Sequence, residues 1–403
     1  MGAEIYLVGI GMGQDGTLTK KAQEIIDQSD LLIGANRMLE GFKALGKTSF
    51  VSYLPREIGD YLRVHTQYQK VAILLSGDVG FYSGAKGLLN ELTDFNVKLV
   101  PGISSLIYFC AKLKMPWQNV CLTSVHGKDN LLIPRIKRES KTFALLNGGS
   151  SLKELCEKLK YYGLGQVILH IGERLSYEDE RIISCRAEEL TDFNFDPLLV
   201  VLVENPNPDT KVFEQIEDEA FIRGEVPMTK SEVRTVSIAK LGLTKDAVVY
   251  DVGAGTGSVA IEMAQKSPDI RVYAIEKNEK GLELIKRNKQ KFAADNLEVI
   301  GGIAPEALEE LPAPTHVFIG GSAGNLKEIL ECIYKKNKNV KVVLNTVSLN
   351  TLTEVMNLIE TGQYEALDIV QMNISKAKKL GKYQMMMGQN PIYIMTIEKT
   401  NAD

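Results

Sequence analysis

Three glycines at alternate positions follow an acidic residue in the second half of the chain. The segment reads Val248-Val-Tyr-Asp-Val-Gly-Ala-Gly-Thr-Gly-Ser258, which places Gly253, Gly255 and Gly257 after Asp251. Glycine allows a backbone to turn sharply and to approach a ligand closely at the start of a helix. A dinucleotide fingerprint needs its third glycine one position later, so this spacing indicates a different nucleoside-type ligand.

A second carboxylate follows 25 residues after Asp251, at the end of the strand predicted over Arg271–Glu276. We expect Glu276 to accept hydrogen bonds from both hydroxyls of a ribose. Asp251 would repel a pyrophosphate, but it can accept a hydrogen bond from an amino group. An acid on each of two strands around a G-x-G-x-G turn is the arrangement that S-adenosylmethionine-dependent methyltransferases share. The sequence therefore predicts S-adenosylmethionine as a cofactor.

The next two strand ends in this half are also rich in small residues. Gly301-Gly-Ile-Ala-Pro305 leaves room for an adenine, which we expect to lie against Gly302, Ile303 and Ala304. In Phe318-Ile-Gly-Gly-Ser322, we expect Gly320 and Gly321 to face the same crevice, because ligands of open α/β sheets bind at the carboxyl ends of the strands. A tight strand-to-helix turn is the alternative explanation of this glycine pair.

The first half of the chain has glycine-rich segments of a different kind. Gly9-Ile-Gly-Met-Gly-Gln-Asp-Gly16 fits G-x-G-x-x-G, yet no acid ends the next predicted strand, so it is a poor dinucleotide site. Two later strand ends read Leu75-Ser-Gly-Asp-Val-Gly80 and Val100-Pro-Gly-Ile-Ser-Ser105. The serine pair at the end of the second segment is alternatively only a helix N-cap.

Short apolar strands alternate with helical segments along the chain, which predicts α/β folding with largely parallel sheets. The stretch Glu204-Asn-Pro-Asn-Pro-Asp-Thr210 favours turn or extended backbone and is the best boundary. We therefore expect two α/β domains, over residues 1–207 and 208–403. The second is expected to close with two long strands, Ala366–Ile374 and Ile392–Lys399.

Composition restricts the function of the 403 residues. Lys and Arg number 47 and Asp and Glu 51, for a net charge of −4 without a basic cluster, so nucleic acid is not an expected partner. The five cysteines have no C-x₂-C spacing and complete no zinc pattern with the histidines, so no metal is expected. No signal peptide or membrane span is recognisable, and we expect a cytoplasmic protein.

Four segments of the second half resemble the decarboxylating precorrin methyltransferases of cobalamin biosynthesis. They are Ile222-Arg-Gly-Glu-Val-Pro-Met-Thr-Lys-Ser-Glu-Val-Arg234, the glycine turn, Phe318-Ile-Gly-Gly-Ser322 and the closing Leu380-Gly-Lys-Tyr with Gln389-Asn-Pro. The resemblance covers about residues 214–400. It implies methylation at C15 of the corrin ring with loss of CO₂ from the C12 acetate.

The first half resembles the tetrapyrrole (corrin/porphyrin) methylases over about residues 3–204, and within them the branch that methylates C5. The resemblance implies a two-lobed domain with its own S-adenosylmethionine. It further implies donor contacts for Ser76, Gly77, Asp78, Ser104 and Ser105, and places Gly11 and Gly13 beside the macrocycle. The family has proline where this chain has Met12 and Val79, which loosens the two loops.

Methyl transfer from a sulfonium depends mainly on holding nucleophile and methyl group in line. This agrees with the lack of a catalytic triad or of paired catalytic carboxylates in the sequence, and no catalytic residue is assigned. We expect a precorrin or cobalt-precorrin as substrate, with its carboxylates and ring bound by Arg223, Thr229, Lys230 and Arg234, and a homo-oligomer without membrane partners. The alternatives are that only the second domain is active, that the chain senses S-adenosylmethionine without turnover, or that it methylates RNA or protein.

Overall fold

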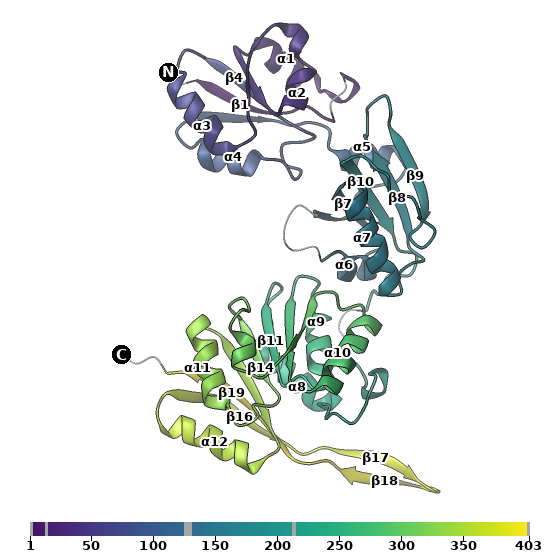
Figure 1. The fold of residues 1–403 in the computed structure, drawn as a ribbon, viewed down its shortest axis with the longest axis vertical. Helices are drawn as coiled ribbons and strands as arrows, with labels where there is room; N and C mark the ends of the chain where they lie inside the picture. Colours follow the sequence, from purple (N-terminus) through teal and green to yellow (C-terminus); the bar gives the residue numbers. More distant parts are fainter. Residues whose placement is uncertain (1–2, 13–14, 125–130, 212–214, 401–403) are drawn as a thin grey trace. The chain divides into compact units, whose positions relative to one another are not determined.

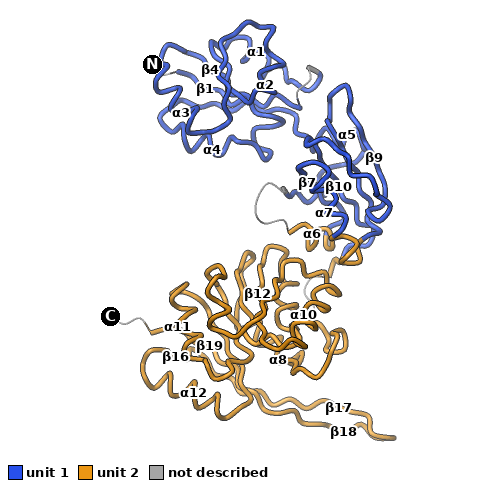
Figure 2. The backbone as a smooth tube through the Cα atoms, in the orientation of Figure 1, with its two compact units in different colours: residues 1–130, 139–157, 165–208 blue, residues 131–138, 158–164, 209–403 orange. Residues whose placement is uncertain are grey.

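The computed structural model describes residues 3–12, 15–124, 131–211 and 215–400 (Figure 1). Contacts within the chain divide it into two compact units, unit 1 with residues 1–130, 139–157 and 165–208, and unit 2 with residues 131–138, 158–164 and 209–403 (Figure 2). Residues 131–138 and 158–164 belong to unit 2 although they precede its main part in the sequence. A hydrogen bond from the Tyr162 hydroxyl to Asp295 Oδ1, at 2.9 Å, is one of the contacts that hold them there. No helix within the described ranges is long and apolar enough to cross a bilayer.

Unit 1 begins with a five-stranded parallel sheet in the order β3-β2-β4-β1-β5. Its central strands are buried on both faces, as expected for apolar strands covered by helices. Its strands are β1 Glu4–Gly9, β2 Leu31–Gly34, β3 Thr48–Val51, β4 Lys70–Leu75 and β5 Asn96–Val100. Its helices are α1 Lys20–Gln28, α2 Asn36–Glu40, α3 Pro55–Val64 and α4 Ala85–Glu91.

The second sheet of unit 1 has the order β6-β7-β10-β8-β9 and is mostly antiparallel. This differs from the largely parallel sheet that the alternating pattern predicts, because β8, β9 and β10 follow one another without intervening helices. The strands are β6 Cys121–Ser124, β7 Lys141–Asn147, β8 Ile168–Glu173, β9 Arg181–Arg186 and β10 Leu198–Glu204. The helices of this part of the chain are α5 Ser105–Lys112, α6 Leu132–Arg138 and α7 Gly148–Tyr161, of which α6 belongs to unit 2.

Unit 2 contains a seven-stranded sheet in the order β13-β12-β11-β14-β15-β19-β16. The first five strands along the chain are parallel, and β19 runs antiparallel between β15 and β16. The strands are β11 Val248–Val252, β12 Arg271–Glu276, β13 Leu297–Gly301, β14 His316–Ile319, β15 Lys341–Thr346, β16 Tyr364–Met372 and β19 Ile392–Lys399. The order reverses beside β11, which gives a doubly wound, Rossmann-like sheet with a crevice at the switch point.

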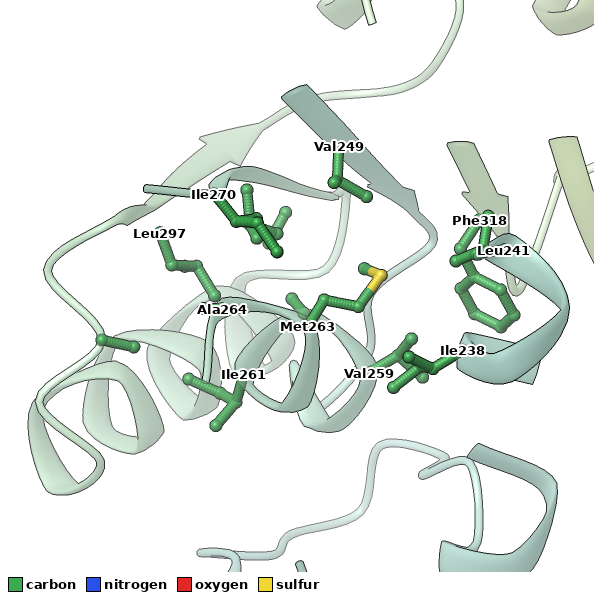
Figure 3. Packing of buried hydrophobic residues seen from close by; sticks show 14 of the residues in the cluster. Ile238, Leu241, Val249, Val259, Ile261, Met263, Ala264, Ile270, Leu297 and Phe318 are labelled. Carbon is green, nitrogen blue, oxygen red and sulfur yellow. The ribbon is translucent and has the colours of Figure 1, made fainter. Parts of the chain in front are cut away.

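Helices cover both faces of this sheet. One buried cluster packs α8, α9 and α10 against the strands, and Ile285 of α10 is a member. Ile238 and Val259 of the same cluster are labelled in Figure 3. Another packs α11 and α12 against the opposite face. The helices are α8 Ser231–Leu241, α9 Ser258–Ala264, α10 Glu279–Lys291, α11 Leu326–Lys336 and α12 Leu349–Glu360. The predicted α/β class is confirmed.

Between its two closing strands, unit 2 has a hairpin that the sequence pattern does not predict. Strands β17 Ser375–Leu380 and β18 Tyr383–Gly388 form a separate two-stranded sheet, which projects from unit 2 (Figure 1). Gly381 lies at the turn with a φ of 61°, a conformation that glycine adopts without strain. We refer to Ser375–Gly388 as the arm.

Candidate functional site

The glycine turn of unit 2 is built so that only glycine fits. Gly253, Gly255 and Gly257 have φ angles of 75°, 58° and 77°. A Cβ at Gly253 would lie 2.7 Å from the Gly321 carbonyl oxygen, and one at Gly255 would lie 2.7 Å from that of Pro227. Gly257 occupies the N-cap position of α9. The glycine turn therefore packs closely against two other segments of the chain, one at Pro227 and one at Gly321.

Glu276 ends β12 directly beside this turn and is almost fully buried. Its Oε2 accepts a hydrogen bond from the Gly255 N–H at 2.7 Å, and its Oε1 accepts one from the Asn278 N–H at 2.9 Å. The carboxylate is thus fixed by two backbone donors, and each oxygen keeps a further lone pair.

A cavity of about 370 Å³ lies at the carboxyl ends of β11, β12, β13 and β14. A Cβ added to Gly321 would meet no atom within 4 Å, so the backbone of Gly321 is open to a ligand. Other residues of the wall were not predicted, among them Val226, Pro227, Lys277, Asn278 and Ser322, and proximity in sequence to predicted residues is the only signal for them. The predicted residues that the structure brings together in its wall are Gly253, Gly255, Glu276, Gly302, Ile303, Ala304, Gly320, Gly321 and Thr229.

Asp251 is not part of this wall. It is buried beneath the turn, where its Oδ2 accepts a hydrogen bond from the Ala260 N–H at 2.9 Å. Its Oδ1 has no hydrogen-bond partner in the part of the chain that the structure describes. Burial, and secondarily the charge of Glu276, raise the pKa of the Asp251 carboxyl to about 7. Asp251 therefore supports the turn from below, and Gly257 likewise lies outside the lining.

The prediction that Arg234 binds substrate is wrong, because its side chain is fully buried. Its Nε donates to Glu262 Oε2 at 2.6 Å and its Nη1 to Asp218 Oδ1 at 3.2 Å. Nη1 also donates to the Thr229 carbonyl oxygen at 2.7 Å, and Nη2 to that of Ile216. Arg234 is a positioning residue that fixes the segment carrying Thr229 at the edge of the cavity.

The two other predicted cations lie outside the cavity wall. Arg223 is exposed, whereas Lys230 is half-buried with its Nζ 3.9 Å from Asp218 Oδ2. Lys230 precedes α8 and follows directly on Thr229, so it stands near the cavity without lining it.

Unit 1 has its own cavity of about 400 Å³, between its two sheets. Ser76, Gly77 and Ser105 are the predicted residues in its wall. Arg37 donates a hydrogen bond to the Tyr177 hydroxyl at 2.6 Å, and both residues line the cavity. For Phe81 and Tyr82 the sequence left core and ligand wall as alternatives, and both line the cavity. Asn147 and Tyr177 also line it, and the sequence assigned them no role because they follow no motif.

Asp78 and Ser104 hold loops in place and do not line the cavity. Asp78 accepts hydrogen bonds from the Gly80 N–H at 2.8 Å and from the Gly102 N–H at 3.0 Å, which joins the two predicted donor loops. Ser104 is the N-cap of α5, with its Oγ accepting from the Ile107 N–H at 3.3 Å. The alternative explanation of Ser104 as a cap thus agrees with its geometry.

Gly11 pairs with one of these loops through backbone hydrogen bonds in both directions with Gly77, at 3.1 and 2.5 Å. Gly13 lies outside the described residues. Met12 donates its N–H to Thr17 Oγ1 at 3.1 Å and lines the cavity, whereas a proline would lack that donor. The loop is therefore tied through the very N–H that the family's proline lacks.

Comparisons with known proteins assign a family to each half. A precorrin methyltransferase domain model matches residues 219–399, and a tetrapyrrole (corrin/porphyrin) methylase model matches residues 4–191. A precorrin-6Y C(5,15)-methyltransferase (decarboxylating) from a Sinorhizobium species is 27% identical over 387 residues, covering 93% of this chain and 92% of its own.

Shorter relatives match the second half alone. A cobalt-precorrin-6B C(15)-methyltransferase (decarboxylating) from Salmonella typhi is 34% identical over 187 residues, which cover 46% of this chain and 96% of that one. The crystal structure of a precorrin-6Y C5,15-methyltransferase from Geobacter metallireducens is 39% identical, covers 47% of this chain and 97% of that one, and has a TM-score of 0.44. The resemblance of the second half to decarboxylating precorrin methyltransferases is confirmed, and the chain belongs to the precorrin methyltransferase family.

Proposed function

We propose that the chain transfers methyl groups from S-adenosylmethionine to C5 and to C15 of a precorrin or cobalt-precorrin, and releases CO₂ from the C12 acetate. Unit 1 would act at C5 and unit 2 at C15. The observation that carries this proposal is a separate glycine-bordered cavity in each unit, together with a relative of this activity aligned over 93% of the chain.

The residues of unit 2 fit the methyl donor. Glu276 offers a carboxylate to the ribose hydroxyls, Gly302, Ile303 and Ala304 leave space for the adenine, and Gly320 and Gly321 expose backbone. Bound there, S-adenosylmethionine supplies an electrophilic methyl group on a sulfonium. Asp251 and the positive φ angles of the glycines hold the turn in the conformation that forms this side of the cavity.

In unit 1, Ser76, Gly77 and Ser105 would hold a second donor, with Asp78 and Ser104 keeping their loops in register. Gly11 would flank the macrocycle through the loop that it shares with Gly77. The hydrogen bond from Met12 to Thr17 supports an ordered loop beside the macrocycle despite the missing proline.

The protein's own contribution to the chemistry is orientation. A macrocycle carbon is the nucleophile, and holding it in line with the methyl group contributes up to about 7–11 kcal/mol to lowering the barrier. The side chains that bind the ring have to meet several carboxylates. Arg223 and Lys230 are the predicted cations near unit 2's cavity, and Lys277 is a cation in its wall. Val226 and Ile303 give the cavity wall apolar surface, against which the ring and the donor would displace water on binding.

We also propose that the chain is a homo-oligomer in the cytoplasm. Val51, Tyr53 and Leu54 are exposed at and just beyond the edge strand β3 of unit 1, where an unpaired strand and apolar side chains favour association. No disulfide joins the five cysteines, in agreement with a reducing compartment.

Mass spectrometry of the product tests the activity. The full chain is incubated with S-adenosylmethionine and precorrin-6Y, with and without cobalt, and we expect the product to gain two methyl groups and lose one CO₂. One methyl group with loss of CO₂ would mean that only unit 2 is active. Donor binding without any turnover would contradict the proposal and favour a sensor.

A further inference from the structure

The arm leaves unit 2 at the same edge of the sheet that carries the donor cavity. Met372 at the end of β16 pairs with Ile392, and Thr346 at the carboxyl end of β15 pairs with Tyr393. The chain between Met372 and Ile392 therefore emerges where the parallel strands end. The lining residue Gly320 directly follows β14, which is the neighbour of β15 in the same parallel set.

One lysine anchors the base of the arm beside this cavity. Lys376 Nζ lies 2.7 Å from Glu232 Oε1 and donates a hydrogen bond to Ser231 Oγ at 3.4 Å. The Glu232 carboxylate raises the pKa of Lys376, so this lysine is charged. Ser231 and Glu232 form the start of α8 and follow within three residues of Thr229, which lines the cavity.

The register of the hairpin gives the arm two different faces. Lys376 is opposite Met387 and Lys378 is opposite Met385, and side chains two residues apart in a strand share a face. The anchored face therefore carries Lys376, Lys378, Met385 and Met387. The opposite face carries Ala377, Lys379, Met386 and Gln384.

The anchored face combines exposed apolar surface with an unneutralised cation. Met385 is 50% and Met387 47% exposed. Lys378 has no acidic partner in the described part of the chain, and residues 375–391 contain no Asp or Glu. A two-stranded hairpin is only marginally stable by itself in water, so a bound partner would stabilise this surface. Its chemistry fits a flat apolar ring with carboxylates at its edge.

We infer that the anchored face of the arm is part of the substrate site of unit 2, and this rests on the proposed function. Met385 and Met387 contact a face of the macrocycle, because flexible thioethers adapt to flat apolar surfaces. Lys378 pairs with a peripheral carboxylate, about 7 Å along the strand from the anchoring Lys376. The arm thus helps to hold the ring beside the donor cavity without contacting the donor.

A pair of matched charge reversals tests this inference. Lys378→Glu and Lys379→Glu make the same change on adjacent residues of one strand, on opposite faces. With the full chain and precorrin-6Y, we expect Lys378→Glu to raise the KM for the precorrin about tenfold or more. Its kcat and its Kd for S-adenosylmethionine should remain within twofold, and Lys379→Glu should leave all three within twofold. Likewise, Met385→Gln should raise the KM for the precorrin and Met386→Gln should not.

Equal KM values in the two lysine variants would overturn the inference. So would a loss of self-association by Lys378→Glu in sedimentation with an unchanged KM, since the anchored face would then bind a second copy. If the wild-type chain methylates no precorrin, the proposed function fails by itself. The arm is then tested by quenching of uroporphyrin III fluorescence, where binding weakened by Lys378→Glu but not by Lys379→Glu supports the anchored face and equal binding refutes it.

Discussion

Asp251 shows how one residue can serve a cavity without entering it. Its carboxyl lies under the glycine turn, receives one hydrogen bond from the backbone of Ala260 and has a second oxygen without a partner in the described chain. A buried carboxylate with so few donors is costly to ionise. Burial therefore raises the pKa of Asp251 to about 7, so the neutral form is favoured in the folded protein below that pH.

Asp251→Asn should remove a pH dependence from the stability of unit 2. The pKa of this carboxyl is raised from its ordinary 3.8 to about 7 in the fold, so its contribution to stability is complete below about pH 4 and is lost as the pH rises through 7. The asparagine cannot ionise. We therefore expect the variant to gain stability relative to wild type between pH 5 and pH 8, by about 1–4 kcal/mol.

Hydrogen exchange of amides in β11 and α9 measures this difference locally. Asp246→Asn, at an exposed position near the start of β11, is the control and should follow the wild type at both pH values. A stability difference between Asp251→Asn and wild type that is the same at pH 5 and pH 8 would contradict the assignment.

Residue types and their order along the chain predict much of unit 2's cavity but not the role of every polar residue. Glu276 and the glycines were found because they stand at strand ends, where the sheet brings them together. Arg234 was misassigned because an arginine in a helix is ordinarily exposed. What buries it is pairing with Glu262 and Asp218, which are distant in sequence and follow no pattern.

At the scale of elements, two glycines in the strand-to-helix turns of unit 2 differ in what a side chain would meet. Gly253 has a positive φ and packs against the backbone of Gly321, so it is needed by the chain itself. Gly321 has open space where a side chain would project, so the chain itself does not require glycine there, and a side chain would occupy part of the cavity. Both glycines line the same cavity. Substituting each in turn therefore distinguishes an effect on the stability of the fold from an effect on ligand binding.

Gly253→Ala should lower the free energy of unfolding of unit 2 by about 1–3 kcal/mol or more, because of its strained φ and the 2.7 Å approach to Gly321. Gly321→Ala should leave the Tm unchanged and weaken S-adenosylmethionine binding about tenfold, since its methyl group occupies cavity space. Calorimetric titration and thermal unfolding of both variants provide the measurements. A Gly321→Ala chain that binds the donor as tightly as wild type would place the donor elsewhere.

The arm is one of the elements that sequence patterns did not predict. Its strands mix lysine and methionine without the apolar alternation of a half-buried strand, since neither face is covered by the sheet. The antiparallel sheet of unit 1 was not predicted either. Its strands follow the parallel strands of the first sheet along the chain, and no change in the sequence pattern marks where helical crossovers give way to direct connections. Covered parallel strands, in contrast, are apolar throughout and easily recognised.

At the scale of the whole molecule, the second half corresponds to a relative that exists as a separate protein. The Salmonella typhi relative aligns over 96% of its length with 46% of this chain. The two cavities lie in different units, so a change to one leaves the wall of the other intact. Under our proposal, association between chains is a separate property, for which the exposed edge strand β3 of unit 1 is the candidate surface.

Tyr53→Glu should weaken self-association. Tyr53 is 76% exposed beside Val51 and Leu54, and a buried charge at such a contact would lose its hydration. Sedimentation velocity of the full chain should show a shift toward monomer, with C15 methylation retained at high enzyme concentration. A wild-type chain that sediments as a monomer would remove the basis of this proposal.

The way Glu276 is held also bears on turnover. Both of its oxygens already accept hydrogen bonds from the protein's own backbone, so the carboxylate needs no reorganisation when a nucleoside arrives or departs. Loss of the methyl group alters the donor only at sulfur and leaves its ribose unchanged. If S-adenosylmethionine binds there as proposed, Glu276 contacts a part of it that methyl transfer leaves unchanged, so the demethylated product would compete for the same cavity until it is released.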